Sequence, residues 1–188
     1  YADNAMYKAK SQGKNRYVVY ASDMLHNSIE ELQLETDLRK ALERNEFILH
    51  YQPQICNKTG DMIGVEALIR WNHPTLGLIY PDKFIDLAEE TGLITNIGEW
   101  VIEEACSQNK KWIDAGMPPF KVAVNLSTQQ FFKLNLVSHV QGVLERTGLD
   151  PQYLVVEITE SMAMDFDYSL KVLQQLKDLG VYISIDDF

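Results

Sequence analysis

The chain has 188 residues, of which 46% are hydrophobic and 23% are charged, as is usual for an ordinary globular protein. Its formal net charge of -10 argues against tight binding to a nucleic-acid polymer, because the phosphates of DNA and RNA require a clustered Lys and Arg surface. A small phosphate ligand held by one arginine and a metal ion is compatible with this charge.

The first part of the chain predicts a helix, a short strand and a connector. Asp3 is a suitable N-cap for a helix in "NAMYKAKSQ", and the "RYVVY" that follows has the composition of a strand. Residues 21–29 are expected to be a connector. From Glu30 to about Asn45, leucines interleaved with charges predict an amphipathic helix that bridges two domains.

From residue 47 onward, strands and helices are expected to alternate. The predicted strands are 47–52, 61–71, 121–127, 153–161 and 181–188, and the predicted helices are 81–92, 97–116, 136–148 and 168–180. Repeated strand-then-helix units imply a parallel sheet, which leaves an open doubly wound sheet and a (β/α)8 barrel as the two candidates.

The cysteines and the termini indicate the compartment. Cys56 and Cys106 lie in unrelated segments without metal-type spacing, so two reduced thiols in a cytosolic domain are expected. No apolar run reaches the length of a membrane span, and the N-terminus has no signal-peptide pattern. The expectation is therefore a cytoplasmic segment without membrane contact. Both ends look cut, since the chain starts without Met and stops after "ISIDDF".

Oxygen-bearing side chains stand at the ends of four predicted strands. These residues are Glu66, Asn125, Glu157 and the adjacent pair Asp186 and Asp187. Ligands gather at the carboxyl ends of strands in α/β folds, and such oxygens are the ligands that Mg2+ or Mn2+ prefers. The pair of aspartates could serve two ions, as two-metal phosphodiester hydrolysis requires.

Within "GVEALIRW", Glu66, Leu68 and Arg70 are predicted to share one face of a strand. On that face the Arg70 guanidinium could grip a phosphate bidentately while a metal ion polarises it. A simpler interpretation is that Glu66 and Arg70 are solvated rim residues or pair with each other.

Two further interpretations stay open for the acidic and amide residues. Strand-end Asp and Asn often only cap the following helix. Glu160 lies three residues past the proposed ligand Glu157, which favours a loop or capping residue over a ligand.

The ordered blocks "LHYQPQI", "VEALIRWNHPTLGLIYPDKFIDLAEETGLI", "IGEWVIEEAC", "VAVNLSTQQF", "LVVEITES" and "ISIDDF" resemble the EAL family, the cyclic di-GMP phosphodiesterases. The resemblance covers about residues 30–188. The opening twenty residues resemble the last helix and strand of a GGDEF domain. The implied organisation is a GGDEF remnant over 1–20, a linker over 21–29, and the N-terminal part of an EAL domain over 30–188.

The resemblance implies a modified (β/α)8 barrel whose first strand runs against the others. It also implies hydrolysis of cyclic di-GMP to linear pGpG with Mg2+ or Mn2+. Mapped by motif, the metal ligands look like Glu66, Asn125, Glu157, Asp186 and Asp187, with Asp187 also at the attacking water. Gln52, Leu68 and Arg70 look like substrate contacts, and Glu160 looks like the residue that holds the active-site loop.

The chain departs from the family pattern after "DDF". The family continues with a Gly-rich loop, a catalytic lysine, a metal-binding glutamate and a glutamine, so the barrel is expected to be truncated after about its fifth strand. On this basis the activity belongs to a longer parent, which could be membrane-anchored and could dimerise through its EAL domain. The alternative is a receptor module that binds cyclic di-GMP without cleaving it.

Overall fold

The computed structural model describes residues 23–133, 135–163 and 166–186, and the chain divides into two units, Tyr1–Arg44 and Asn45–Phe188. In the first unit the described element is helix α2, Asp23–Ala41. It begins at Asp23 rather than at Glu30, so the segment expected to be a connector is largely helical. Neither Gly nor Pro occurs between residues 21 and 30, so no residue there interrupts a helix. The helix and strand expected in residues 1–20 lie outside the described residues.

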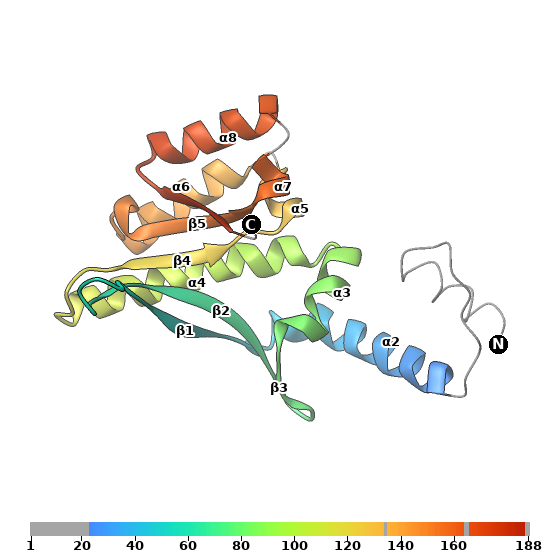
Figure 1. Cartoon of the computed structure of the whole chain (residues 1–188). Helices are drawn as coiled ribbons and strands as arrows, with labels where there is room; N and C mark the ends of the chain where they lie inside the picture. Colours follow the sequence, from blue (N-terminus) through green and yellow to red (C-terminus); the bar gives the residue numbers. More distant parts are fainter. Residues whose placement is uncertain (1–22, 134, 164–165, 187–188) are drawn as a thin grey trace. The chain divides into compact units, whose positions relative to one another are not determined.

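The second unit is built on one sheet with the strand order β1-β2-β4-β5-β6, and β3 pairs with the C-terminal residues of β2 (Figure 1). The strands are β1 Phe47–Ile55, β2 Met62–His73, β3 Gly77–Ile79, β4 Lys121–Asn125, β5 Leu154–Thr159 and β6 Tyr182–Asp186. Strand β1 runs antiparallel to β2, whereas β2, β4, β5 and β6 are mutually parallel. The expected reversal of the first strand is therefore present.

The connections of the parallel strands all advance in one direction. Helix α4, Ile94–Asp114, joins β2 to β4; α6, Leu136–Thr147, joins β4 to β5; and α8, Phe166–Asp178, joins β5 to β6. Because such crossovers are right-handed, helices that advance the sheet one strand at a time all lie on the same face. A doubly wound sheet reverses its direction and places helices on both faces. The described strands therefore follow the winding of a (β/α)8 barrel, with β1 and β6 at the two edges.

The core lies between this sheet and its helices. Helix α4 packs against β1, β2 and β4, α6 packs against α4 and α8, and α8 packs against β6. Alternate strand residues face these helices and are almost fully buried, namely Val65, Ala67, Val122, Val124, Leu154, Val156 and Ile158. The buried residues of α4 recur at helical spacing from Ile94 to Asn109. The sheet's other face is the one on which Glu66, Leu68 and Arg70 lie.

The predicted helix over residues 81–92 is interrupted in the structure. A 3-10 turn, Pro81–Lys83, is followed by α3, Ile85–Glu90, and Phe84 between them has a non-helical φ of -135°. The Phe84 side chain is fully buried and packs against Phe47 and Trp71. Burial of this ring breaks the helix, because its hydrophobic contribution outweighs the local preference for continuous helix.

Several short elements have no counterpart in the sequence prediction. They are β3, the 3-10 turn Pro151–Tyr153, α5, Thr128–Phe131, and α7, Glu160–Ala163. The strand predicted over 153–161 therefore ends at Thr159, and residues 160–161 are helical instead. Helix α5 begins with a capping box, in which Ser127 Oγ accepts the backbone N–H of Gln130 and Gln130 Oε1 accepts that of Ser127. Among the described helices, none has both the length and the apolar character that a membrane span needs.

Candidate active site

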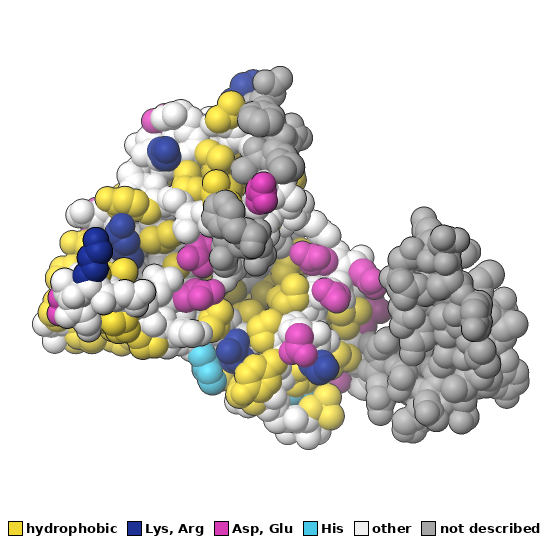
Figure 2. All heavy atoms as spheres, in the orientation of Figure 1, with side chains coloured by type: hydrophobic (Ala, Val, Ile, Leu, Met, Phe, Trp, Pro, Cys, Tyr) yellow, Lys and Arg dark blue, Asp and Glu magenta, His cyan; other side chains and the backbone are white. Residues whose placement is uncertain are grey.

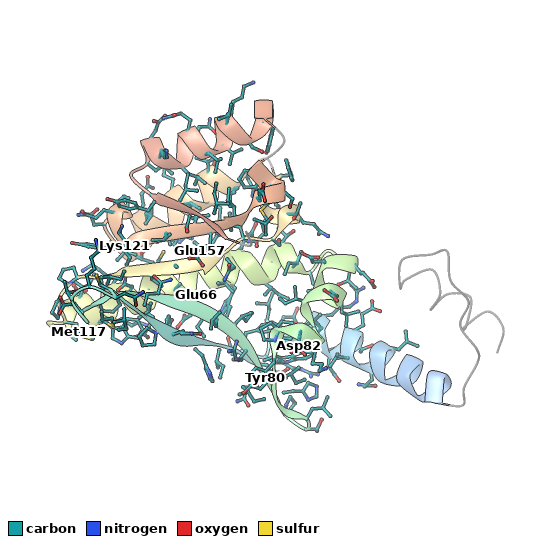
Figure 3. All side chains as sticks on the ribbon, in the orientation of Figure 1. Glu66, Tyr80, Asp82, Met117, Lys121 and Glu157 are labelled. Carbon is teal, nitrogen blue, oxygen red and sulfur yellow. The ribbon has the colours of Figure 1, made fainter. Side chains whose placement is uncertain are left out.

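Strand pairing brings most of the predicted site residues to one face of the sheet. Gln52 of β1 lies opposite Glu66 of β2, and Asn125 of β4 lies beside Glu157 of β5. Glu66 is in turn aligned with Ala123, two residues before Asn125 and on the same face. Because β2, β4 and β5 are parallel, their carboxyl ends point the same way, although β2 continues beyond Glu66 to His73. Figure 3 shows Glu66 and Glu157 on strands that lie on either side of β4.

Glu66 and Asn125 are in direct contact. Asn125 Nδ2 donates a hydrogen bond of 2.8 Å to Glu66 Oε1, although the two residues are 59 positions apart in the sequence. Glu157, next to Asn125 in the ladder, is only 8% exposed, whereas Asn125 is exposed and Glu66 is half-buried. Asn125 is the last residue of β4, but β2 continues past Glu66 to His73, so the expectation that Glu66 stands at the end of its strand is wrong. Two carboxylates and an amide from β2, β4 and β5 therefore converge beside the carboxyl end of β4. In the space-filling view, acidic side chains lie near β2 and β4 (Figure 2).

A close approach of the backbones supports this contact. An added Cβ at Gly64 would lie 2.9 Å from the carbonyl oxygen of Lys121, so only glycine fits where β2 pairs with the start of β4. Glu66 is two residues further along the same face. The glycine that precedes "VEALIR" thus allows the pairing that presents Glu66 to Asn125.

Arg70 is held by uncharged groups. Its Nη1 donates to the backbone oxygen of Ile69 at 2.8 Å, and its Cζ lies 4.9 Å from the centroid of the Tyr80 ring. The ion pairs of the described residues include none between Glu66 and Arg70, so the interpretation of the two as salt-bridge partners is wrong. Arg70 thus keeps its charge available to an anion.

The other predicted residues have varied positions. Leu68 is half-buried between Glu66 and Arg70, and Gln52 is exposed. Glu160 is the exposed first residue of α7, directly after β5, where a capping or loop residue was expected. Asp186 is the last residue of β6, and Asp187 lies outside the described residues.

Tyr80, which contacts Arg70, was not predicted from the sequence. It follows β3, a strand of three residues, and such a short strand gives no periodic signal. The available signal was the hairpin "HPTLGLIY", in which Gly77 has a φ of 72° and Pro81 ends the returning strand.

The donor set fits a hard divalent cation in its chemistry. Glu66, Asn125 and Glu157 offer carboxylate and amide oxygens, the ligands that Mg2+ and Mn2+ accept, and none of the three is a soft sulfur or imidazole ligand. Within the described ranges, no three His, Cys, Asp or Glu side chains form a metal-type cluster by themselves. The described part therefore supplies two carboxylates and an amide toward such a site.

Comparisons with known proteins point to one family. The sequence model of the EAL domain family matches residues 35–188 of this chain. The bifunctional diguanylate cyclase/cyclic di-GMP phosphodiesterase MucR of Pseudomonas aeruginosa is 54% identical over 188 residues, which is 100% of this chain and 27% of MucR. The cyclic di-GMP phosphodiesterase PdeR of Escherichia coli is 40% identical over 189 residues, which is 100% of this chain and 28% of PdeR.

A solved structure, the PaMucR phosphodiesterase in a c-di-GMP complex, has a TM-score of 0.80 and 55% sequence identity. The match covers 83% of this chain and 64% of that chain. The FimX EAL domain of Pseudomonas aeruginosa bound to c-di-GMP has a TM-score of 0.73 and 28% identity, over 84% of this chain and 62% of that one. The chain thus spans about a quarter of the length of the curated relatives MucR and PdeR.

Proposed function

The chain belongs to the EAL domain family, and we propose that its activity is the metal-dependent hydrolysis of cyclic di-GMP to linear pGpG. The observation that carries this proposal is the Glu66–Asn125 contact beside the largely buried Glu157, next to the carboxyl end of β4. Relatives named as cyclic di-GMP phosphodiesterases support the choice of substrate. The activity is proposed for the full-length protein that carries this chain.

Glu66, Asn125 and Glu157 are the described residues that would hold Mg2+ or Mn2+, with Asp186 and Asp187 completing the set by motif. A divalent ion bound there would polarise a phosphoryl oxygen and supply a metal-activated water. Asp187 is assigned to a second ion and to the attacking water by its motif alone. Asn125 already orients the Glu66 carboxylate by donating to Oε1, so part of the donor set is arranged before any cation binds.

Substrate binding is assigned to the same face of β1 and β2. Arg70 carries a positive charge that no carboxylate of the described residues neutralises, which suits it to a phosphate of the ligand. Leu68 supplies an apolar surface between Glu66 and Arg70. Gln52 lies across the ladder from Glu66 and offers amide donors and acceptors. Glu160, at the start of α7, is proposed to hold the active-site loop.

The second candidate is a receptor that binds cyclic di-GMP without cleaving it. The structural likeness to the FimX EAL domain bound to c-di-GMP supports this second candidate. The described metal-type residues Glu66, Asn125 and Glu157 have the types that hydrolysis requires, which favours the enzyme.

The deciding experiment compares turnover and binding in the full-length protein. Hydrolysis is followed by chromatography of pGpG at saturating Mg2+, and binding by calorimetry with Ca2+ in place of Mg2+. Glu66→Ala and Asp186→Ala should abolish turnover, while Glu145→Ala, an exposed glutamate on α6, serves as the control. Near-normal turnover in either site variant would overturn the metal assignment. Binding by the unmodified protein without any turnover would establish the receptor.

The domain organisation is also a proposal. Residues 1–20 are assigned to the end of a GGDEF domain, 21–29 to a linker and 30–188 to a part of an EAL barrel. The closed barrel, a homodimer through the EAL domain and a cytoplasmic location stay predictions.

A further inference from the structure

We propose that Tyr80 is a positioning residue that fixes the Arg70 guanidinium in the orientation in which it meets a phosphate of the ligand. The inference rests on the proposed function, because it concerns how the substrate-binding arginine of that site is held. It goes beyond that function by assigning a role to Tyr80 and to the hairpin of β2 and β3 that follows Arg70.

The register of the hairpin places Tyr80 beside Arg70. Trp71 pairs with Ile79 in the antiparallel β2–β3 ladder, so the next position along this ladder sets Tyr80 opposite Arg70. Tyr80 keeps an extended backbone, with φ -87° and ψ 157°, before Pro81 ends the strand. On the other side of β2, Ile48 of β1 pairs with Arg70. Arg70 therefore has Ile48 as its cross-strand neighbour on β1 and Tyr80 as its neighbour on the opposite side.

The contacts of Arg70 indicate that packing decides where its guanidinium points. Nε is buried and has no hydrogen-bond partner within the part of the chain that the structure describes. A freely rotating guanidinium would turn this donor toward water, because a buried unpaired N–H costs free energy. The ring of Tyr80, 4.9 Å from Cζ, is the aromatic contact that holds the group in place.

The chemistry of this contact suits a binding cation. A cation–π contact attracts the guanidinium through the quadrupole of the ring and leaves its net charge unchanged. A carboxylate in the same place would orient Arg70 and also neutralise it, which would weaken its attraction for a phosphate. Tyr80 is itself 53% exposed, so removing its ring should disturb the core little.

The test is a double-mutant cycle on cyclic di-GMP binding by the full-length protein, measured by calorimetry with Ca2+. Tyr80→Ala should weaken binding roughly three- to tenfold, as expected for a partly exposed cation–π contact. Tyr80→Phe should restore most of the affinity, because the ring remains. In the Arg70→Ala background, Tyr80→Ala should have no further effect. Leu76→Ala, at an exposed apolar position of the same hairpin, is the matched control.

The outcomes separate this inference from the proposed function. If the unmodified protein does not bind cyclic di-GMP, the proposed function fails. If it binds and Tyr80→Ala binds equally well, the positioning role fails alone. An equal loss from Tyr80→Ala with and without Arg70 would also overturn it, since Tyr80 would then act on the ligand directly. If Arg70→Ala binds too weakly to measure, Arg70→Lys replaces it as the background, and the effect of Tyr80→Ala should shrink because the planar guanidinium is gone.

Discussion

Replacing Asn125 by Asp tests the proposed metal site without any measurement of activity. In the structure, Asn125 Nδ2 donates to Glu66 Oε1 at 2.8 Å. Asn125→Asp keeps the shape of the side chain but exchanges this donor for a second anionic oxygen. Without a cation, the carboxylates of residues 66 and 125 would then face each other across β2 and β4. With a cation, the same change adds a charged ligand.

The size of the effect follows from the geometry. The lost hydrogen bond contributes about 1 kcal/mol to stability, as is usual for a single protein hydrogen bond. Two like charges at about 4 Å repel by roughly 1 kcal/mol in water. Because Asn125 is exposed, this value applies rather than the larger repulsion energy of a buried site. The sum of about 2 kcal/mol corresponds to a decrease in Tm of about 4–8 °C for a domain of this size.

Thermal unfolding followed by circular dichroism, in EDTA and in saturating MgCl2, measures this effect. Asn125→Asp should lower the Tm in EDTA, and Mg2+ should raise the Tm of this variant more than that of the unmodified chain, by ligand linkage. Asn72→Asp, the same change at an exposed position of β2, should show no such response to Mg2+. An equal Mg2+ response in all three proteins would refute a cation site at Glu66 and Asn125.

Three further predictions concern packing, thiol chemistry and turnover. Gly98→Ala would place a Cβ 1.9 Å from Nε2 of the buried Gln130, so it should lower the free energy of unfolding by about 1–3 kcal/mol in urea. In a Gln130→Ala background the same change should stabilise by up to about 1 kcal/mol through helix propensity, and a stabilising effect in the unmodified chain would contradict the packing argument. Iodoacetamide at neutral pH should label Cys56 and spare Cys106, because hydrogen bonds from Thr59 and Lys58 lower the pKa of Cys56 whereas burial raises the pKa of Cys106 to about 12. Peptide mass spectrometry reads this out, and equal labelling would count against it. The 188-residue chain incubated with cyclic di-GMP and Mn2+ should give no pGpG above background by chromatography, and clear turnover would mean that these residues suffice for catalysis.

The long elements of the second unit were predictable because their periodicity is strong. Strand β6, Tyr182–Asp186, lies within the strand predicted over 181–188, and α6, Leu136–Thr147, matches the helix predicted over 136–148. Gly148 ends that helix with a φ of 68°. Short elements such as β3 and α5 contain too few residues for a period to appear. The break at Phe84 could not be predicted locally, because its cause is the aromatic packing around Trp71.

The candidate site was likewise predictable from the sequence only in part. The residue types at Glu66, Asn125 and Glu157, and the strand face on which each lies, were readable from the sequence because a strand alternates its faces. The end of β4 at Asn125 was also predicted, whereas β2 continues past Glu66 to His73. Strand order and register came only from the tertiary structure, because hydrogen bonds between distant strands depend on the whole sheet. They set Glu157 beside Asn125 and bring Asn125 to 2.8 Å from Glu66. Tertiary pairing likewise gave Arg70 the Tyr80 ring in place of Glu66 as its partner, since Tyr80 reaches Arg70 through a hairpin whose returning strand has only three residues.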